Sequence, residues 1–442
     1  MRDGSRAHGG TGLSKMHLNW FSPLHPERTD IAHCTARLAP ALLRHFDITF
    51  WTDLRVDGQA IPAGAGVQQF DPRNIEGREF NSRLFEGLNV YNFGNDARFH
   101  AGIFQVGPDI ASGAHHRSFL ERLRKVALEY RRPIMFGVLA TKQGDDPTGW
   151  EYQTRYIDET VAAGGRMFGQ GTTRSINAIF SLKSYLPFDV LPAWRPLRAL
   201  PLAEQKKRLA DPAVRRELVE AESRMKPRDN VFQGGGAATT DPRKPDYSNL
   251  FALKGVDWDD PTVDQLAKAR GQHPVEVMID LSLADENQVY VQPLVNESPD
   301  DVLGILKHQR TLATFSDSGA HVCQEMGSSL QTHLLSYWVR KRGAFTLEQA
   351  VKKLTHDNAV AWELEGRGLV REGYQADLVL FEENGIRPRL PTVERDLPGG
   401  ARRLVQKADG IKATLVNGAI AFEDGDATGA FAGTVLKGRL AS

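Results

Sequence analysis

The sequence predicts an α/β fold with a parallel sheet, open or closed, in the middle of the chain. From about His116 to Asp317, amphipathic helical segments alternate with short apolar runs, which is typical of strands joined by helical crossovers. Upstream, residues 16–52 read as strand, loop, helix and strand, the beginning of a doubly wound βαβ arrangement. From Ala376 onward, short strands separated by Asn-Gly and Asp-Gly pairs indicate a small β unit.

The composition excludes several functional classes. The 442 residues include 55 basic and 55 acidic side chains, so neither nucleic acid nor an anionic membrane is expected as a partner. Only Cys34 and Cys323 are present, which argues against a disulfide framework and against a multi-cysteine zinc ribbon. No apolar run approaches the length of a bilayer, and residues 1–15 lack the apolar core of a signal peptide. We therefore expect a cytoplasmic protein with a disordered segment at 1–15.

Local signals place individual elements in the middle of the chain. Thr262 with Gln265 and Thr346 with Gln349 form the pattern of a capping box, and Ser298 followed by Pro299 marks another helix start. Helices are expected at 118–130, 155–165, 202–222, 262–271, 275–286, 298–309, 329–343 and 346–364, and buried strands at 133–140, 167–171, 288–294 and 311–317. Between Pro133 and Asp317 we count about five parallel strands, fewer than the eight that close a (β/α)8 barrel.

The stretch TFSDSGAHV, residues 314–322, contains the candidate site. Asp317 directly follows a buried strand, where the reacting groups of a parallel barrel lie. Ser318 and Gly319 allow a tight turn there, so Asp317 or Ser318 is equally consistent with the cap of a short helix. The local pattern leaves the two interpretations open. Further along, Leu334 and Trp338 are expected in the core, and His333 at a cap or at the surface.

The context of this stretch resembles one enzyme family. TFSDSGAHV, then LEQAVKKLTHDNAVAWELEGRGLVREGYQADLVLFE, then VNGAIAFEDGDATGAFAGTVLKG resemble the C-terminal half of the D-aminoacylase (N-acyl-D-amino-acid deacylase) branch of the amidohydrolase superfamily. Upstream, RRPIMFGVLA, GGRMFGQGTTRS and LPLAEQKKRLADPAVRREL are similar to the same group. The resemblance runs from about Ser118 to the end of the chain.

The resemblance implies a (β/α)8 barrel beside a small β-sandwich, and hydrolysis of a non-peptide amide bond by metal-activated water. It implies zinc or another divalent metal as cofactor and a small-molecule substrate such as an N-acyl amino acid. Asp317 matches the catalytic aspartate after the last barrel strand, which contacts the metal-bound water and can itself be a ligand. Ser318 and His321 are the candidate substrate-binding residues. Arg367 is expected to fix the join to the β unit, and Asp377 to form a turn or strand-edge hydrogen bond.

The N-terminal part of the family pattern is absent. The chain contains no His-x-His pair, and His115 and His116 are adjacent, so in an extended strand they would face opposite sides. The metal ligands other than Asp317 are therefore not identified. In place of that part, residues 16–106 resemble the first lobe of a two-lobed glycosyltransferase, with a seam between about Gly102 and Arg117. The predicted domains are this Rossmann-like fragment (16–106), an incomplete amidohydrolase barrel (117–375) and a C-terminal β unit (376–442).

The sequence is consistent with three functions. The first is an N-acyl-D-amino-acid deacylase-like hydrolase that uses Asp317. The second is a glycosyltransferase-like sugar-nucleotide protein, supported by residues 16–106 alone. The third is a non-catalytic fusion remnant. Unpaired strand edges in a partial barrel also favour association into a homo-oligomer.

Overall fold

A computed structural model describes most of the chain and divides it into two units, residues 1–102 with 438–442, and residues 103–437. The segment predicted to be disordered, 1–15, lies outside the described residues, as does the strand expected at 89–95. The described ranges are 16–21, 40, 43–44, 46–52, 65–69, 103–106, 113–129, 131–138, 140, 149–225, 244–256, 259–314 and 329–436.

In the first unit the structure describes a three-stranded parallel sheet. Its strands are β1 Met16–Phe21, β2 Phe46–Thr52 and β3 Gly66–Gln69, in the order β1-β2-β3. Met16 pairs with Phe46, and Thr49 pairs with Gly66. The two strands predicted within residues 16–52 are therefore confirmed, and their parallel pairing requires a crossover between them. The crossover helix predicted there lies largely outside the described residues.

The second unit contains a four-stranded parallel sheet in the order β10-β6-β5-β4. Its strands are β4 Phe104–Val106, β5 Ile134–Gly137, β6 Met167–Gly171 and β10 Thr311–Ala313. Because β4 pairs with β5, residues 104–106 lie in this sheet and not in the N-terminal fragment to which the predicted boundary assigned them. A short strand carries too little local signal to reveal which sheet it joins.

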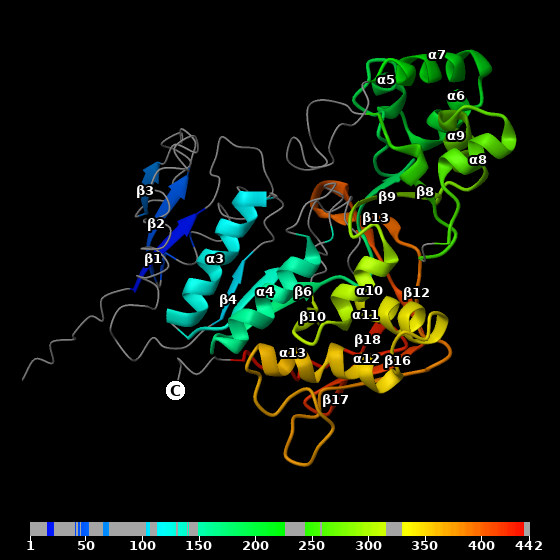
Figure 1. Cartoon of the computed structure of the whole chain (residues 1–442). Coiled ribbons are helices and arrows are strands. Elements are labelled where there is room, and N and C mark those ends of the chain that lie inside the picture. The colour runs from blue at the N-terminus through cyan, green and yellow to red at the C-terminus, as the bar shows by residue number, and fades with distance from the viewer. Residues whose placement is uncertain are drawn as a thin grey trace, which may run out of the picture. The chain divides into compact units, whose positions relative to one another are not determined.

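Helices cover one face of this sheet. α3 Gly113–Glu129 packs against β5, while α4 Trp150–Ala162 and α10 Pro299–Lys307 pack against β6 (Figure 1). The side chains of Ile134 and Phe136 on this face are fully buried. His115 and His116, considered above as parts of an extended strand, belong to α3.

A separate helical group follows β6 (Figure 1, green). Its base is an antiparallel sheet in the order β7-β9-β8, formed by β7 Ile176–Ser181, β8 Phe251–Ala252 and β9 Val289–Val295. The strand at 288–294 was predicted as part of the parallel sheet, and that prediction is wrong, because β9 runs antiparallel to β7 and to β8. An apolar run shows that a strand is buried but does not show the direction of its partners. The helices of the group are α5 Arg195–Arg198, α6 Leu202–Leu209, α7 Pro212–Ser223, η4 Tyr247–Asn249, α8 Val263–Arg270 and α9 Pro274–Ala284.

After residue 329 the chain is helical and then forms a β unit. The π-helix η5, Leu334–Lys341, carries the buried side chains of Leu334 and Trp338, which confirms that these residues belong to the core. The helical elements are α11 Leu330–His333, η5 Leu334–Lys341, α12 Leu347–Leu354 and α13 His356–Ala361. Among the polar contacts, Arg367 forms an ion pair with Asp377, and Asp377 Oδ1 accepts a hydrogen bond from the backbone of Asn417. Both residues therefore tie the segment after the last helix to the β unit, as predicted.

The β unit consists of antiparallel sheets. The largest has the order β11-β16-β17-β18, with β11 Leu378–Phe381, β16 Ile411–Val416, β17 Ala419–Glu423 and β18 Asp426–Ala427. Two strand pairs accompany it: β12 Arg387–Pro388 with β15 Ala408–Asp409, and β13 Thr392–Leu397 with β14 Ala401–Val405, the latter joined by η6 Pro398–Gly400. Asn417 and Gly418 have φ of 48° and 80°, so the Asn-Gly pair forms the tight hairpin turn expected from the sequence.

Candidate active site

The face of the parallel sheet opposite α3, α4 and α10 carries a group of apolar side chains, called here the apolar layer, and a group of polar side chains, called the polar layer. In the apolar layer Met135 and Leu312 pack with Ala361, and Ile103, Phe168 and Trp362 complete the cluster. Both Met135 and Leu312 are fully buried. This layer packs the sheet against Ala361 of α13. In parallel barrels the reacting groups lie at the carboxyl ends of the strands.

The polar layer is a chain of carboxamide and hydroxyl groups across the sheet. Gln105 Nε2 on β4 donates to Gln170 Oε1 on β6 at 3.0 Å, and Gln170 Nε2 donates to Thr314 Oγ1 at 3.1 Å. Gln170 pairs in the sheet with Gly137 of β5. Because glycine has no side chain, the amide of Gln105 can reach Gln170 across that strand. Gln170 is only 2% exposed, so its hydrogen bonds hold it in one orientation.

The residues predicted to do the chemistry follow this layer in sequence. β10 ends at Ala313 and Thr314 is the last described residue of this segment, which confirms the strand that precedes the candidate site. Asp317, Ser318 and His321 themselves lie outside the described residues. Their assignment as catalytic and substrate-binding residues therefore stays a prediction.

Asn296 joins the ends of strands from two different sheets. It directly follows β9 and is fully buried with φ of 58°, a left-handed conformation that asparagine adopts more readily than most residues. Its Oδ1 accepts the backbone N–H of Ala140 at 2.7 Å, and its Nδ2 donates to Thr172 Oγ1 at 2.7 Å. Ala140 follows β5 and Thr172 follows β6, so one side chain fixes three strand ends together.

The residues after β6 are also tied to the π-helix. Thr173 Oγ1 donates to the carbonyl of Leu330 at 2.9 Å, and Trp338 Nε1 donates to the carbonyl of Thr173 at 2.6 Å. π-helical turns are rare and concentrate at functional sites. The segment Thr172–Arg174 is thus held at a defined place beside the carboxyl end of β6.

His333 is fully buried beside this segment, contrary to its predicted position at a cap or at the surface. It stacks on Tyr337 at 5.0 Å between ring centroids. Burial, followed by the positive charge of Arg174, lowers the pKa of His333 to about 3. Hydrogen bonds to the backbone of Thr173 and Val256 act in the opposite direction and only partly offset this. His333 is therefore neutral near pH 7, and a neutral imidazole adds no second positive charge beside Arg174.

A small depression that is open to solvent adjoins Arg174. Arg174, Ser175 and Asn177 form its polar end. Its remaining wall is apolar and comes from β8, β9 and the residues after β8: Phe251, Leu253, Val256, Val291 and Pro293. Sequence reasoning missed this depression, because its lining residues are separated by long stretches of chain.

The described residues do not fit the zinc site that the family resemblance implies. Zinc in proteins is held by cysteine, histidine and carboxylate side chains. Nowhere in the described ranges do three such side chains come together in a way that could hold a metal ion. The side chains that do meet on the inner face, from Gln105, Gln170 and Thr314, are carboxamides and a hydroxyl.

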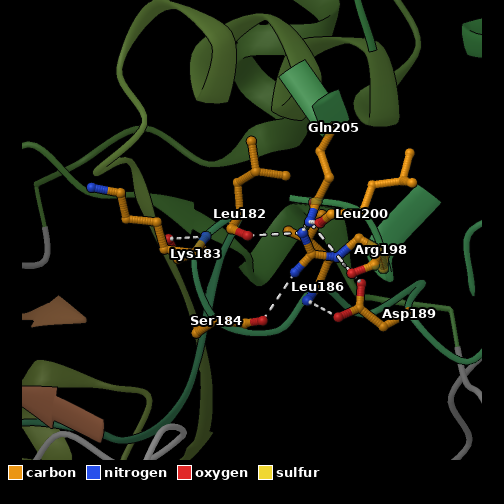
Figure 2. Close-up of polar contacts among 9 residues, drawn as sticks. Leu182, Lys183, Ser184, Leu186, Asp189, Arg198, Leu200 and Gln205 are labelled. Atoms are coloured by element: carbon orange, nitrogen blue, oxygen red, sulfur yellow. Dashed lines mark hydrogen bonds and ion pairs between the residues drawn. The ribbon is translucent and has the colours of Figure 1, made fainter. Parts of the chain in front are cut away.

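A second polar network, in the helical group, is structural (Figure 2). Arg198 Nε bonds Asp189 Oδ1 at 2.7 Å, and its Nη atoms donate to the carbonyls of Leu182 and Ser184 and to Gln205 Oε1. Burial raises the pKa of Asp189, while the charge of Arg198 acts in the opposite direction. All three guanidinium nitrogens of Arg198 are used to fix the loop that follows β7, so this arginine is not part of a ligand site.

A third network surrounds the fully buried Glu222. Its carboxylate accepts a hydrogen bond from Tyr247 at 2.7 Å and pairs with Lys244 at 3.1 Å and His273 at 3.5 Å. Nδ1 of His273 accepts the backbone N–H of Val275 and caps α9. Both ring nitrogens of His273 face protein groups. We therefore interpret this cluster as a structural link between α7, η4 and α9, and not as a catalytic dyad.

Comparisons with known proteins connect the chain to one family. Residues 110–422 match the model of the amidohydrolase family. The chain is 30% identical over 186 residues to an N-acyl-D-aspartate deacylase of Alcaligenes xylosoxydans xylosoxydans, covering 42% of this chain and 31% of that protein. It is 36% identical over 103 residues to a D-aminoacylase of the same organism, covering 23% of this chain and 19% of that protein. These relatives confirm the resemblance to the D-aminoacylase branch, although the chain aligns with only about a third of their length or less.

Solved structures are more distant. A D-aminoacylase shares 17% identity with a TM-score of 0.41, covering 95% of this chain and 67% of the other. An N-acyl-D-glutamate deacylase from Bordetella bronchiseptica, complexed with zinc and a phosphonate inhibitor, shares 13% identity with a TM-score of 0.40, covering 87% and 71%. The family assignment therefore rests on the sequence matches.

Proposed function

Because the chain belongs to the amidohydrolase family, we propose that it hydrolyses the amide bond of an N-acyl amino acid, with Asp317 as its catalytic carboxylate. The observation that carries the proposal is the family match over residues 110–422, which includes β10 and Asp317. The relatives named deacylases of N-acyl-D-amino acids support the choice of substrate.

In this proposal Asp317 acts as a general base. A carboxylate at the carboxyl end of a barrel strand can accept a proton from the attacking water and pass it to the leaving amine. Ser318 and His321 are proposed to contact the substrate. Gln170 and Thr314 would support the start of this segment, because their hydrogen bond holds the residue three positions before Asp317.

Hydrolysis of N-acetyl-D-aspartate and of a panel of N-acetyl-D-amino acids tests the proposal, with release of the free amino acid as the readout. We expect turnover by the wild type and a loss of about 100-fold or more in Asp317→Asn, the size of effect that removal of a general base has. Asp424→Asn is the matched control, since Asp424 is exposed in a turn with φ of 45° that asparagine adopts equally well. An inactive wild type would leave the chain as the non-catalytic remnant, and equal activity in Asp317→Asn would reject the role of Asp317.

We also propose that the barrel of this chain is incomplete. The support is the described parallel sheet, which has four strands in an open order with β4 and β10 at its edges. An experimental structure with eight strands closed around Asp317 would contradict this proposal.

An incomplete barrel would leave unpaired strand edges with which a second copy of the chain could associate. A monomer in sedimentation velocity would contradict the proposed homo-oligomer.

The remaining predictions concern the N-terminal unit and the location of the protein in the cell. The parallel sheet β1-β2-β3 agrees with a Rossmann-like fragment, and binding of a UDP- or GDP-sugar would test its resemblance to a glycosyltransferase lobe. Among the described residues, no helix has the length and apolar character required to cross a bilayer. A cytoplasmic location stays a prediction, which fractionation of the source cells would check.

A further inference from the structure

One edge of the C-terminal β unit carries exposed apolar surface. β11, Leu378–Phe381, is an edge strand of the sheet β11-β16-β17-β18, and its sequence LVLF contains no charge. The side chains of Leu378, Val379 and Leu380 are 36%, 56% and 62% exposed. We propose that this edge pairs with β11 of a second copy of the chain, so that two β units form one continuous antiparallel sheet across a twofold axis.

The outer edge of β11 has backbone groups that can pair with another strand. Toward β16, the carbonyl of Ala376 accepts the N–H of Gly418 at 2.9 Å, and the N–H of Glu382 donates to the carbonyl of Gly410 at 2.8 Å. The extra residue of the β-bulge lies in β16 and not in β11, so the backbone groups of β11 alternate without interruption. Val379 therefore turns its N–H and its carbonyl to the outer edge, where none of the described strands pairs with β11.

A twofold axis at Val379 gives the register that fits these backbone groups. Val379 then lies opposite Val379 of the second copy, and the two residues exchange both N–H···O=C bonds. Leu378 of each copy lies opposite Leu380 of the other, and all four leucines share one face of the joined sheet, because side chains on a strand alternate between faces. Cross-strand apolar pairs of this kind stabilise a sheet, so the edge is complementary to itself.

The same register keeps like charges apart. Two acidic residues flank β11, and neither of them lies opposite an acidic residue of the second copy. Glu382 lies opposite Ala376, and Asp377 lies opposite Phe381. Each of these carboxylates also forms an ion pair within its own chain. The charges at the two ends of the strand are therefore compatible with the pairing.

Apolar side chains near β11 enlarge the surface that a second copy can cover. Ile420 and Phe422 on β17 are exposed, as is Phe431. Asn417 Nδ2 donates to the carbonyl of Ala432 at 2.6 Å, and the next residue of the same turn contacts the start of β11. Stable interfaces bury about 1,200–2,000 Å², more than a pair of four-residue strands supplies, and these side chains provide further apolar area.

Sedimentation velocity of the full-length chain over a range of concentrations tests the proposal. We expect a dimer in the wild type. The double variant Leu378→Lys, Leu380→Lys places lysine opposite lysine at two points, and we expect it to weaken the dimer by about 100-fold or more. Val360→Lys is the matched control, because Val360 is 53% exposed but lies on α13, and it is expected to leave the dimer unchanged. A monomeric wild type, or a dimer that the double substitution does not weaken, would overturn the proposal.

A mixed dimer separates loss of the interface from loss of folding. The double variant Leu378→Glu, Leu380→Glu is expected to be monomeric alone and to form a dimer with the lysine variant, since each lysine then faces a glutamate. Val379→Pro removes the two N–H donors at the axis without disturbing the pairing with β16, and we expect it to weaken the dimer by about tenfold. If the charged variants do not fold, the proline variant carries the test, and an unchanged dimer would reject the pairing. Folded charged variants that form no mixed dimer would reject the register.

The β11 edge is distinct from the barrel edges β4 and β10, and the variants distinguish them. An oligomer that keeps its mass in all the β11 variants would assign association to another edge and reject this interface. Asp317→Asn is expected to dimerise as the wild type does, so the outcome is independent of whether the chain hydrolyses an N-acyl amino acid.

Discussion

Removal of the Asn296 side chain is expected to destabilise the chain more than most single substitutions, because it breaks two buried hydrogen bonds. The bonds run from Ala140 N to Asn296 Oδ1 and from Asn296 Nδ2 to Thr172 Oγ1, both at 2.7 Å. In Asn296→Gly each lost bond costs about 1 kcal/mol, and the buried groups left without a partner bring the total loss of unfolding free energy to about 2–4 kcal/mol. Asn296→Ala retains the left-handed φ of 58° and adds about 1 kcal/mol, because a Cβ is unfavourable there.

Urea denaturation followed by tryptophan fluorescence measures both variants against the wild type. We expect the urea midpoint to decrease from the wild type to Asn296→Gly and again to Asn296→Ala. The slope of unfolding free energy against urea concentration is expected to stay unchanged. The comparison between glycine and alanine isolates the backbone contribution, and the comparison between glycine and the wild type isolates the side-chain bonds. Equal midpoints for all three proteins would show that the strand ends are not held together by Asn296.

Two further substitutions test packing and pH dependence. Gly304→Ala would place a Cβ against the ring of Trp150, and we expect it to lower the unfolding free energy by about 1–3 kcal/mol. Gly255→Ala is the control, because no atom lies within 4 Å of its added Cβ, and an equal effect of both substitutions would contradict the contact. His333 titrates near its ordinary value of 6.5 when unfolded but at about 3 when folded, so the unfolded state binds the proton first as the pH falls. Stability is therefore expected to decrease by about 1.4 kcal/mol per pH unit from 6.5 toward 3, and a His333→Leu variant with the same pH profile as the wild type would refute this cause.

Local signals in the sequence predicted local features correctly. The capping boxes of Thr262 with Gln265 and of Thr346 with Gln349 are both present, and Ser298 caps α10 with Pro299 at its first position. These features depend on hydrogen bonds between residues two or three positions apart, so a short stretch contains all the groups involved.

The candidate site was predictable only in part. The strand before Asp317 was recognised, because an apolar run followed by a carboxylate is a local pattern. The roles of Gln170, Asn296 and Arg174 were not, because no neighbouring residue in the sequence indicates their contacts. The hydrogen bond between Asn296 and Thr172 joins positions 124 residues apart, and that between Gln170 and Thr314 joins positions 144 apart.

The sequence by itself determined the α/β class, the helix caps, the Asn-Gly hairpin and membership of the amidohydrolase family. Tertiary structure alone decided that β9 runs antiparallel, that His333 is buried and neutral, and that Arg174 borders a small depression. The reason is physical: caps and turns are satisfied within a few residues, whereas strand direction, burial and the charge around a side chain depend on which distant segments pack against it.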